Sequence, residues 1–126
     1  MASYQQATRT LNLAAGSDLS SSQYKAVVLS SDGAVDVAGA AAEAIGFLMN
    51  APTTGDIAEI ASNGGGGKAI AGGTITAGDI LATDANGDVV TATANQVGVA
   101  RALESAVDND IFNVEVLTVF SGTATV

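Results

Sequence analysis

The chain repeats one pattern of short β-type segments, and this repeat limits its fold more than any other sequence feature. The segment VVLSSDGAVDV at 27–37 resembles DILATDANGDVV at 79–90, and TTGDIAEIA at 53–61 resembles DNDIFNVEV at 108–116. The two copies are therefore about 52–54 residues apart. A repeat at a fixed spacing indicates that one structural unit is present twice. Chance similarity among hairpins rich in Ala, Val, Gly and Asp is the alternative explanation.

The pattern of each copy predicts a hairpin with an Asp/Gly turn, then a strand that begins with Ile-Gly or Val-Gly, and then a strand that begins with Asp-Ile. Asn86-Gly87 is a strong hairpin signal, because both residue types accept a positive φ. The matched residues are Leu29 with Leu81, Asp32 with Asp84, Gly46 with Gly98, and Asp56 with Asp110. The pattern predicts an all-β fold, a small β-barrel or β-sandwich of short hairpins built from two similar lobes.

The predicted organisation has an extended N-terminal arm, a β domain and a tail. These parts span 1–23, 24–120 (with the internal repeat at 25–61 and 78–117) and 121–126. One strand is expected near Thr8–Leu13 in the arm, with a floppy terminus as the alternative. The alternating run DIAEIA predicts Ile57 and Ile60 near the core. The fold has at most one short helix, at AGAAAEA (38–44), where a loop is equally compatible with the flanking glycines.

The charge balance argues against nucleic acid as a partner. The net charge is −9, from thirteen acidic and four scattered basic residues, and such a chain repels phosphates. The N-terminus lacks the basic and apolar regions of a signal peptide, and no apolar run reaches about 18 residues. We therefore expect no membrane partner and synthesis in a host cytoplasm. The chain also has no His and no Cys, which removes the commonest general base and thiolate chemistry.

The glycine run before Lys68 does not match a nucleotide-binding loop. Such a loop needs a Ser or Thr after the Gly-Lys pair, and Ala69 stands there instead. The structural interpretation is a glycine-rich loop tip that lets the backbone turn tightly. A biotinyl or lipoyl carrier domain needs a lysine at its hairpin tip, and the hairpin DANGD has none. We predict neither a cofactor nor catalytic residues, so the chain is not expected to be an enzyme.

The acidic hairpin DANGD leaves one metal question open. Asp84, Asn86 and Asp88 could offer three oxygens to calcium. A full calcium loop needs a bidentate Glu at position twelve, where this chain has Asn95. A two-residue hairpin turn explains the same residues, so we predict no metal site and leave weak calcium binding to be tested.

The stretch AGGTITAGDILATDANGDVVTATANQVGVA at 71–100 resembles the small capsid decoration, or cement, proteins of tailed bacteriophages. The matching motifs are Ile75–Ile80, Asp84–Val89 and Val97–Ala100. The resemblance covers roughly residues 55–117 and, through the repeat, extends weakly to 25–61.

This resemblance implies a structural virion protein on the outside of the head. It would bind the major capsid protein, cement neighbouring subunits and stabilise the expanded capsid. Homotrimers at three-fold or quasi-three-fold sites are the common arrangement, although the duplicated unit departs from the single-copy pattern and leaves the oligomeric state open. The family has no catalytic residues to carry over. The alternative is a head-fibre or adhesin-type module that presents Gly-rich loops to a host ligand.

The arm supplies the candidate capsid-binding residues, because a cement protein needs extended segments or edge strands that can add to a partner's sheet. These residues are Thr8, Arg9, Thr10, Leu11, Asn12 and Leu13.

Overall fold

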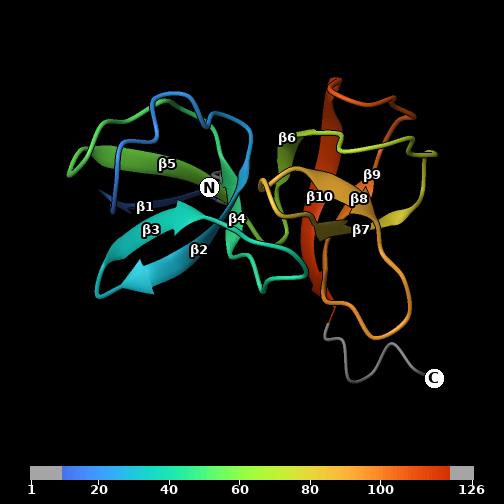
Figure 1. Ribbon diagram of the computed structural model, residues 1–126, viewed down its shortest axis with the longest axis horizontal. Coiled ribbons are helices and arrows are strands. Elements are labelled where there is room, and N and C mark those ends of the chain that lie inside the picture. Colours follow the sequence, from blue (N-terminus) through green and yellow to red (C-terminus); the bar gives the residue numbers. More distant parts are fainter. Residues whose placement is uncertain (1–9, 120–126) are drawn as a thin grey trace, which may run out of the picture.

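The computed structural model describes residues 10–119 and shows an all-β protein without a helix in that part of the chain (Figure 1). The predicted tail at 121–126 lies outside the described residues. The strands are β1 (Thr10–Ala15), β2 (Ala26–Ser31), β3 (Ala34–Val37), β4 (Gly46–Leu48), β5 (Ile57–Ser62), β6 (Gly66–Ile70), β7 (Ile80–Thr83), β8 (Val89–Thr91), β9 (Gly98–Ala102) and β10 (Ile111–Val119).

The strands form two lobes that lie side by side, which confirms the prediction of two similar lobes (Figure 1). Lobe 1 is a closed barrel in the order β1-β3-β2-β4-β5, and lobe 2 is a five-stranded sheet in the order β6-β10-β9-β7-β8. A parallel bridge between Ala71 and Val89 joins the two ends of the lobe 2 sheet. It corresponds to the parallel pairing of Ala15 with Val35 in lobe 1. Both lobes therefore have the same strand order and directions.

The strand register fixes the true alignment of the two copies. Val27 pairs with Gly46 in lobe 1, and Leu81 pairs with Ala100 in lobe 2, so the equivalent residues are 54 positions apart. Our sequence alignment of Leu29 with Leu81, and of Gly46 with Gly98, was therefore wrong by two residues. Side chains alternate between the faces of a strand with a period of two, so a slip of two residues preserves the hydrophobic pattern. The pattern alone could not detect this error.

The alignment of Asp56 with Asp110 is correct, and the two residues have the same role. Each lies in the tight turn before the last strand of its lobe. The carbonyl oxygen of Asp56 accepts a hydrogen bond from the N–H of Ala15, and that of Asp110 accepts one from Ala71, both at 2.8 Å. The turn thus ties the last strand of each lobe to the first.

The structure corrects the predicted position of Ile57. This side chain is 59% exposed, whereas Ile60 is fully buried. Residues three apart on a regular strand point to opposite faces, so both could not be core residues in β5. Ala58 takes the inward position instead.

The strand predicted near Thr8–Leu13 is present as β1 in its described part, but residues 10–23 belong to the folded barrel and not to a separate extended arm. Thr10–Ala15 forms β1 of the barrel, and the loop that follows buries Leu19 against the core of lobe 1. Within the described residues, the folded domain therefore begins at Thr10.

The core consists mainly of small side chains, so the strands must approach closely. A Cβ atom on Gly46 would clash with the carbonyl oxygen of Ala61, which explains the glycine where β4 pairs with β5. Phe47 is the largest fully buried side chain and belongs to a cluster that includes residues of both lobes. The segment 38–44, where helix and loop were both open, is a loop.

Candidate functional site

The candidate capsid-binding residues lie partly on a free strand edge. Thr8 and Arg9 are outside the described residues, whereas Thr10–Leu13 belongs to β1 and pairs with β5 on one side. On the other side, β3 reaches only Ala14 and Ala15. Because the N–H of Ala15 donates to Asp56, the alternation of the ladder turns the N–H and C=O of Asn12 away from β5. Asn12 therefore offers backbone groups to an added strand.

Lobe 2 has an equivalent free edge, at the start of β6. Gly66, Gly67 and Lys68 pair only with β10 in the described part of the chain. The N–H of Ala71 donates to Asp110, so the same alternation turns the N–H and C=O groups of Gly66 and Lys68 away from β10. We call these outward groups the β6 edge. Two of the four glycines that we had placed in a loop tip thus belong to a strand.

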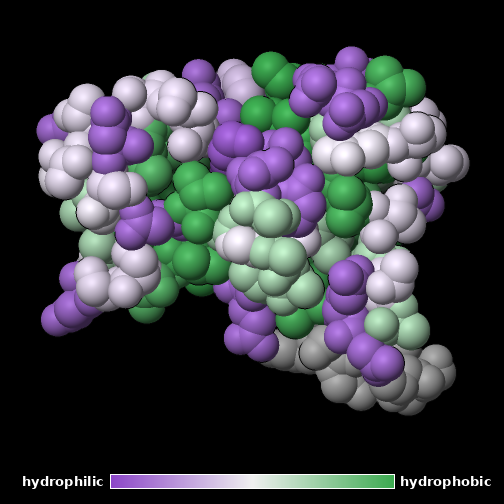
Figure 2. Space-filling view, in the orientation of Figure 1, coloured by the Kyte–Doolittle hydropathy of each residue, from purple (hydrophilic) through white to green (hydrophobic). Residues whose placement is uncertain are grey.

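A pocket of about 620 Å³ opens beside the β6 edge, where the two lobes meet. Lobe 1 contributes Tyr24 and Met49 to this junction pocket. Lobe 2 contributes the rest of the lining, which is Gly66, Gly67, Lys68, Leu103, Glu104, Asn113 and Val114. Figure 2 shows apolar surface on both lobes beside their junction. The volume is in the range of sites that hold a small ligand or a large side chain.

Gly67, one of the residues that line the junction pocket, also packs closely against lobe 1. A Cβ atom on Gly67 would lie 3.0 Å from the Cβ of Ala61 and 3.6 Å from the terminal methyl of Met49. The strand β6 therefore passes directly against lobe 1 at this point, and a larger residue here would push the two lobes apart.

Tyr24 has a strained backbone in the wall of the pocket. Its φ is 72°, in the left-handed region that a bulky residue rarely adopts. The equivalent residue in lobe 2 is Gly78, with a φ of 94°. Residues held against their backbone preference cluster at functional sites. The sequence analysis missed Tyr24, although an alignment at the correct register would have placed a tyrosine opposite a glycine.

Polar side chains line the outer rim of the pocket. The ammonium group of Lys68 donates to Asn113 Oδ1 at 3.0 Å. Glu104 Oε2 accepts from the N–H of Asn113 at 2.8 Å and from its side-chain amide at 3.0 Å. Lobe 1 repeats this arrangement, since Asn50 Oδ1 accepts from the N–H of Glu59 at 3.0 Å. The lining of this open pocket is therefore mixed, with hydrogen-bonded polar side chains beside the apolar surface of Met49, Leu103 and Val114.

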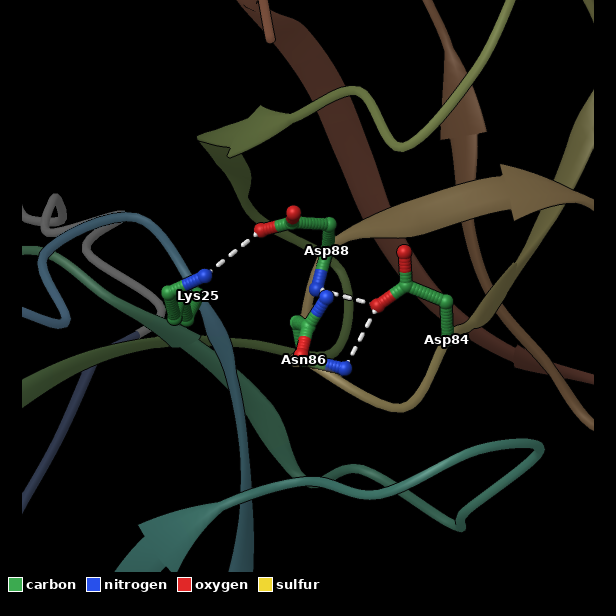
Figure 3. A network of polar contacts seen from close by, with 4 residues as sticks. All are labelled: Lys25, Asp84, Asn86 and Asp88. Atoms are coloured by element: carbon green, nitrogen blue, oxygen red, sulfur yellow. Dashed lines mark hydrogen bonds and ion pairs between the residues drawn. The ribbon is translucent and has the colours of Figure 1, made fainter. Parts of the chain in front are cut away.

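A second set of polar contacts joins the lobes at the hairpin 84–88 (Figure 3). The ammonium group of Lys25 in lobe 1 forms an ion pair with Asp88 Oδ1 at 2.8 Å. Asp84 Oδ1 accepts the N–H groups of Asn86 at 2.8 Å and Asp88 at 3.0 Å. The N–H of Ala26 donates to the carbonyl of Gly87 at 2.8 Å. The acidic residues of this hairpin thus stabilise its turn and its contact with lobe 1.

No cluster of three or more His, Cys, Asp or Glu side chains suited to a metal occurs among residues 10–117. Asp18, on the loop after β1, is an isolated acid with a lowered pKa. The Ser20 hydroxyl and N–H donate to its carboxylate and favour the charged form. No helix capable of crossing a membrane occurs in the described part of the chain.

Thr83 is a buried polar link between the lobes. Its side chain is almost fully buried, and its hydroxyl donates to the carbonyl of Gly39 at 2.6 Å. The same oxygen accepts the N–H of Ala42 at 2.9 Å. These bonds help to hold the segment 38–44 as a loop, because Thr83 of lobe 2 forms hydrogen bonds with its backbone N–H and C=O groups.

Replacement of Thr83 by Val should lower the free energy of unfolding by about 1–3 kcal/mol. The isosteric side chain keeps the volume but removes two hydrogen bonds, one to the N–H of the half-buried Ala42 and one to the carbonyl of Gly39, and each such bond contributes about 0.5–1.5 kcal/mol. Urea unfolding measures the effect. Thr91→Val is the matched control, because Thr91 is exposed and its hydroxyl donates to Asp79 at 3.0 Å. Equal stability of the two variants would contradict the structural role of Thr83.

No protein-family model and no curated protein matches the chain. Among solved structures, the fold is similar to that of the N base of the head fibre protein gp8.5 of bacteriophage phi29. The TM-score is 0.69 with 18% sequence identity, and the match covers 85% of this chain and 92% of that chain. At this identity, the likeness concerns the fold: a pair of small β lobes of this kind also occurs in the base of a phage head fibre.

Proposed function

We propose that this chain is a non-enzymatic structural protein of a tailed-phage virion and attaches to the outer surface of the head. The observation that carries the proposal is the fold similarity to the phi29 head fibre base, which extends over most of both chains. The resemblance of residues 71–100 to capsid decoration proteins supports it independently. The acidic charge keeps many copies soluble before they assemble.

In the finer form of the proposal, the chain cements neighbouring major capsid subunits as a homotrimer at three-fold or quasi-three-fold sites. The free edge of β1 is the proposed contact, because Asn12 can offer an N–H and a C=O to an extended segment of the capsid protein. Many identical weak contacts on one shell would give high avidity.

The second candidate is a head-fibre or adhesin-type module that presents its Gly-rich loops to a host ligand. The solved structure supports it about as well as the first candidate, since that protein is the base of a head fibre. Both candidates share attachment to the head and differ in what the attached protein does.

Attachment can be tested with expanded shells of the encoding phage that lack this protein. We expect the purified chain to sediment with the shells and to add density to their outer surface in electron microscopy. Absence of binding, or density inside the shell, would overturn the proposal. A size measurement of the free protein tests the homotrimer.

The same shells separate the two candidates. A cement protein should raise the temperature at which the shells break, whereas a fibre base should attach without this effect.

The contact itself is tested with Asn12→Pro, which removes an outward N–H without removing a bond to β5. We expect it to weaken attachment at least about tenfold if the β1 edge adds to a capsid strand. The control is Lys68→Pro at the equivalent position of lobe 2.

A further inference from the structure

The β6 edge and the junction pocket form one surface that has no function in the proposed attachment to the head. The edge offers the N–H and C=O groups of Gly66 and Lys68, and both residues also line the pocket. An exposed strand edge promotes uncontrolled pairing between molecules, and proteins usually cover such edges. This combination of outward backbone groups and an open pocket of mixed polar and apolar lining suits an extended segment with one large side chain that has both apolar and polar parts.

The strain at Tyr24 is a second and independent indication of binding here. A glycine at this position would relieve the left-handed backbone, as Gly78 does in lobe 2. Tyr24 nevertheless occupies the position and is one of the residues that line the pocket. Four described non-glycine residues have a positive φ, and Tyr24 is the bulkiest of them and the one that lines this pocket, which agrees with the tendency of backbone strain to occur at ligand sites.

The start of β1 lies close to this surface. Thr10 pairs with Ala61, and a Cβ atom added to Gly67, which lines the pocket, would lie 3.0 Å from the Cβ of Ala61. Nine residues precede Thr10 in the sequence and can span up to about 30 Å when extended. The chain before β1 can therefore reach the β6 edge without leaving its own molecule.

The charge of residues 1–9 complements the rest of the protein. This segment, MASYQQATR, has Arg9 and no acidic residue, whereas residues 10–126 have all thirteen acidic residues and only three basic ones. The pocket lining itself has one residue of each charge, Glu104 and Lys68, so the complementarity is between the segment and the acidic body as a whole. Tyr4 is the one aromatic residue of the segment, and the pocket is large enough to admit its ring against the apolar side chains of Met49 and Leu103.

We propose that residues 1–9 dock on the same molecule, add a short strand to the β6 edge and place Tyr4 in the junction pocket. Because the segment is tethered beside its site, its effective concentration there is high and favours the intramolecular contact. This placement directs Thr8 and Arg9 toward the lobe junction, so the proposed capsid contact narrows to Thr10–Leu13. The inference does not depend on attachment to a phage head and is testable with the isolated protein.

Amide hydrogen exchange, measured by NMR, tests the docking directly. The amides of Gly66 and Lys68 should exchange at least about tenfold more slowly in the full chain than in a chain that begins at Thr10. Equal rates would overturn the proposal. Protection that disappears on dilution would show that the segment comes from a second copy, and this result also overturns it.

A synthetic peptide of residues 1–9 provides the second test, with the chain that begins at Thr10 as its receptor. We expect saturable shifts of the Gly66 and Lys68 amides, and at least about threefold weaker binding when Arg9 of the peptide is replaced by Glu. Shifts confined to the β1 edge would contradict the assigned site.

Three receptor variants separate binding from folding. Tyr24→Gly should lose at least about tenfold in peptide affinity while its melting temperature stays the same or rises, because the backbone strain is relieved. Lys68→Pro should abolish binding, since it removes an outward N–H and retains the pairing with β10. Asn12→Pro changes the equivalent position of lobe 1 and should bind the peptide normally. Normal binding by Tyr24→Gly would contradict the role of the pocket.

Discussion

A chain shortened to begin at residue 21 is expected to lose the fold of lobe 1, whereas a chain that begins at Thr10 should keep it. The shorter chain lacks β1, which pairs with β5 from Thr10 to Ala14 and closes the barrel against β3. It also lacks Leu19, whose buried side chain alone is worth about 2–5 kcal/mol by comparison with Leu→Ala substitutions. The combined loss is comparable with the whole stability of a small domain, about 5–15 kcal/mol.

Circular dichroism and calorimetry distinguish the two truncations. The chain that begins at Thr10 should melt in the same cooperative transition as the full chain, and the chain that begins at residue 21 should lose that transition or lower it severely. This result matters for any attachment assay, because only the chain that begins at Thr10 tests the loss of the terminal segment while keeping the barrel intact. Native melting of the chain that begins at residue 21 would show that β1 is dispensable.

Phe47→Ala is expected to lower the free energy of unfolding by about 3–5 kcal/mol, the range for large aromatic residues truncated in a core. Phe47 is fully buried in the cluster of apolar residues that both lobes share, so the cavity would open where they meet. Chemical unfolding measures the loss, with Arg101→Ala as the matched control. Arg101 occupies the equivalent position of lobe 2 and is exposed, so its replacement should change stability by no more than about 0.5 kcal/mol. A loss below about 1 kcal/mol in Phe47→Ala would contradict a common core.

The two copies differ most at the residues that join the lobes. The buried Phe47 corresponds to the exposed Arg101, and the buried Thr83 corresponds to Leu29, which is 58% exposed. Lys25, which binds Asp88 across the junction, corresponds to Asp79. A duplicated unit can therefore keep its strand order while selected positions change to form one asymmetric contact. The junction pocket, with Tyr24 opposite Gly78 in the alignment, belongs to the same set of differences.

The sequence by itself determined the class of fold, the duplication and the absence of His and Cys chemistry. These conclusions depend on local signals: the alternation of apolar residues, the turn residues such as Asn86-Gly87, and the composition. It also identified Asp56 and Asp110 as equivalent, because each turn holds its aspartate just before a strand. Local signals of this kind act within a few residues and can be read without knowing which strands become neighbours.

The tertiary structure alone decided the register between the copies, the exposure of Ile57 and the inclusion of β1 in the barrel. A strand pattern with a period of two is unchanged by a slip of two residues, and it does not say which face will be covered. The junction pocket was equally invisible, because Tyr24 and Lys68 are far apart in the sequence and meet only through the packing of one lobe against the other. Local residue preferences give the two lobes, and only their packing creates the surface between them.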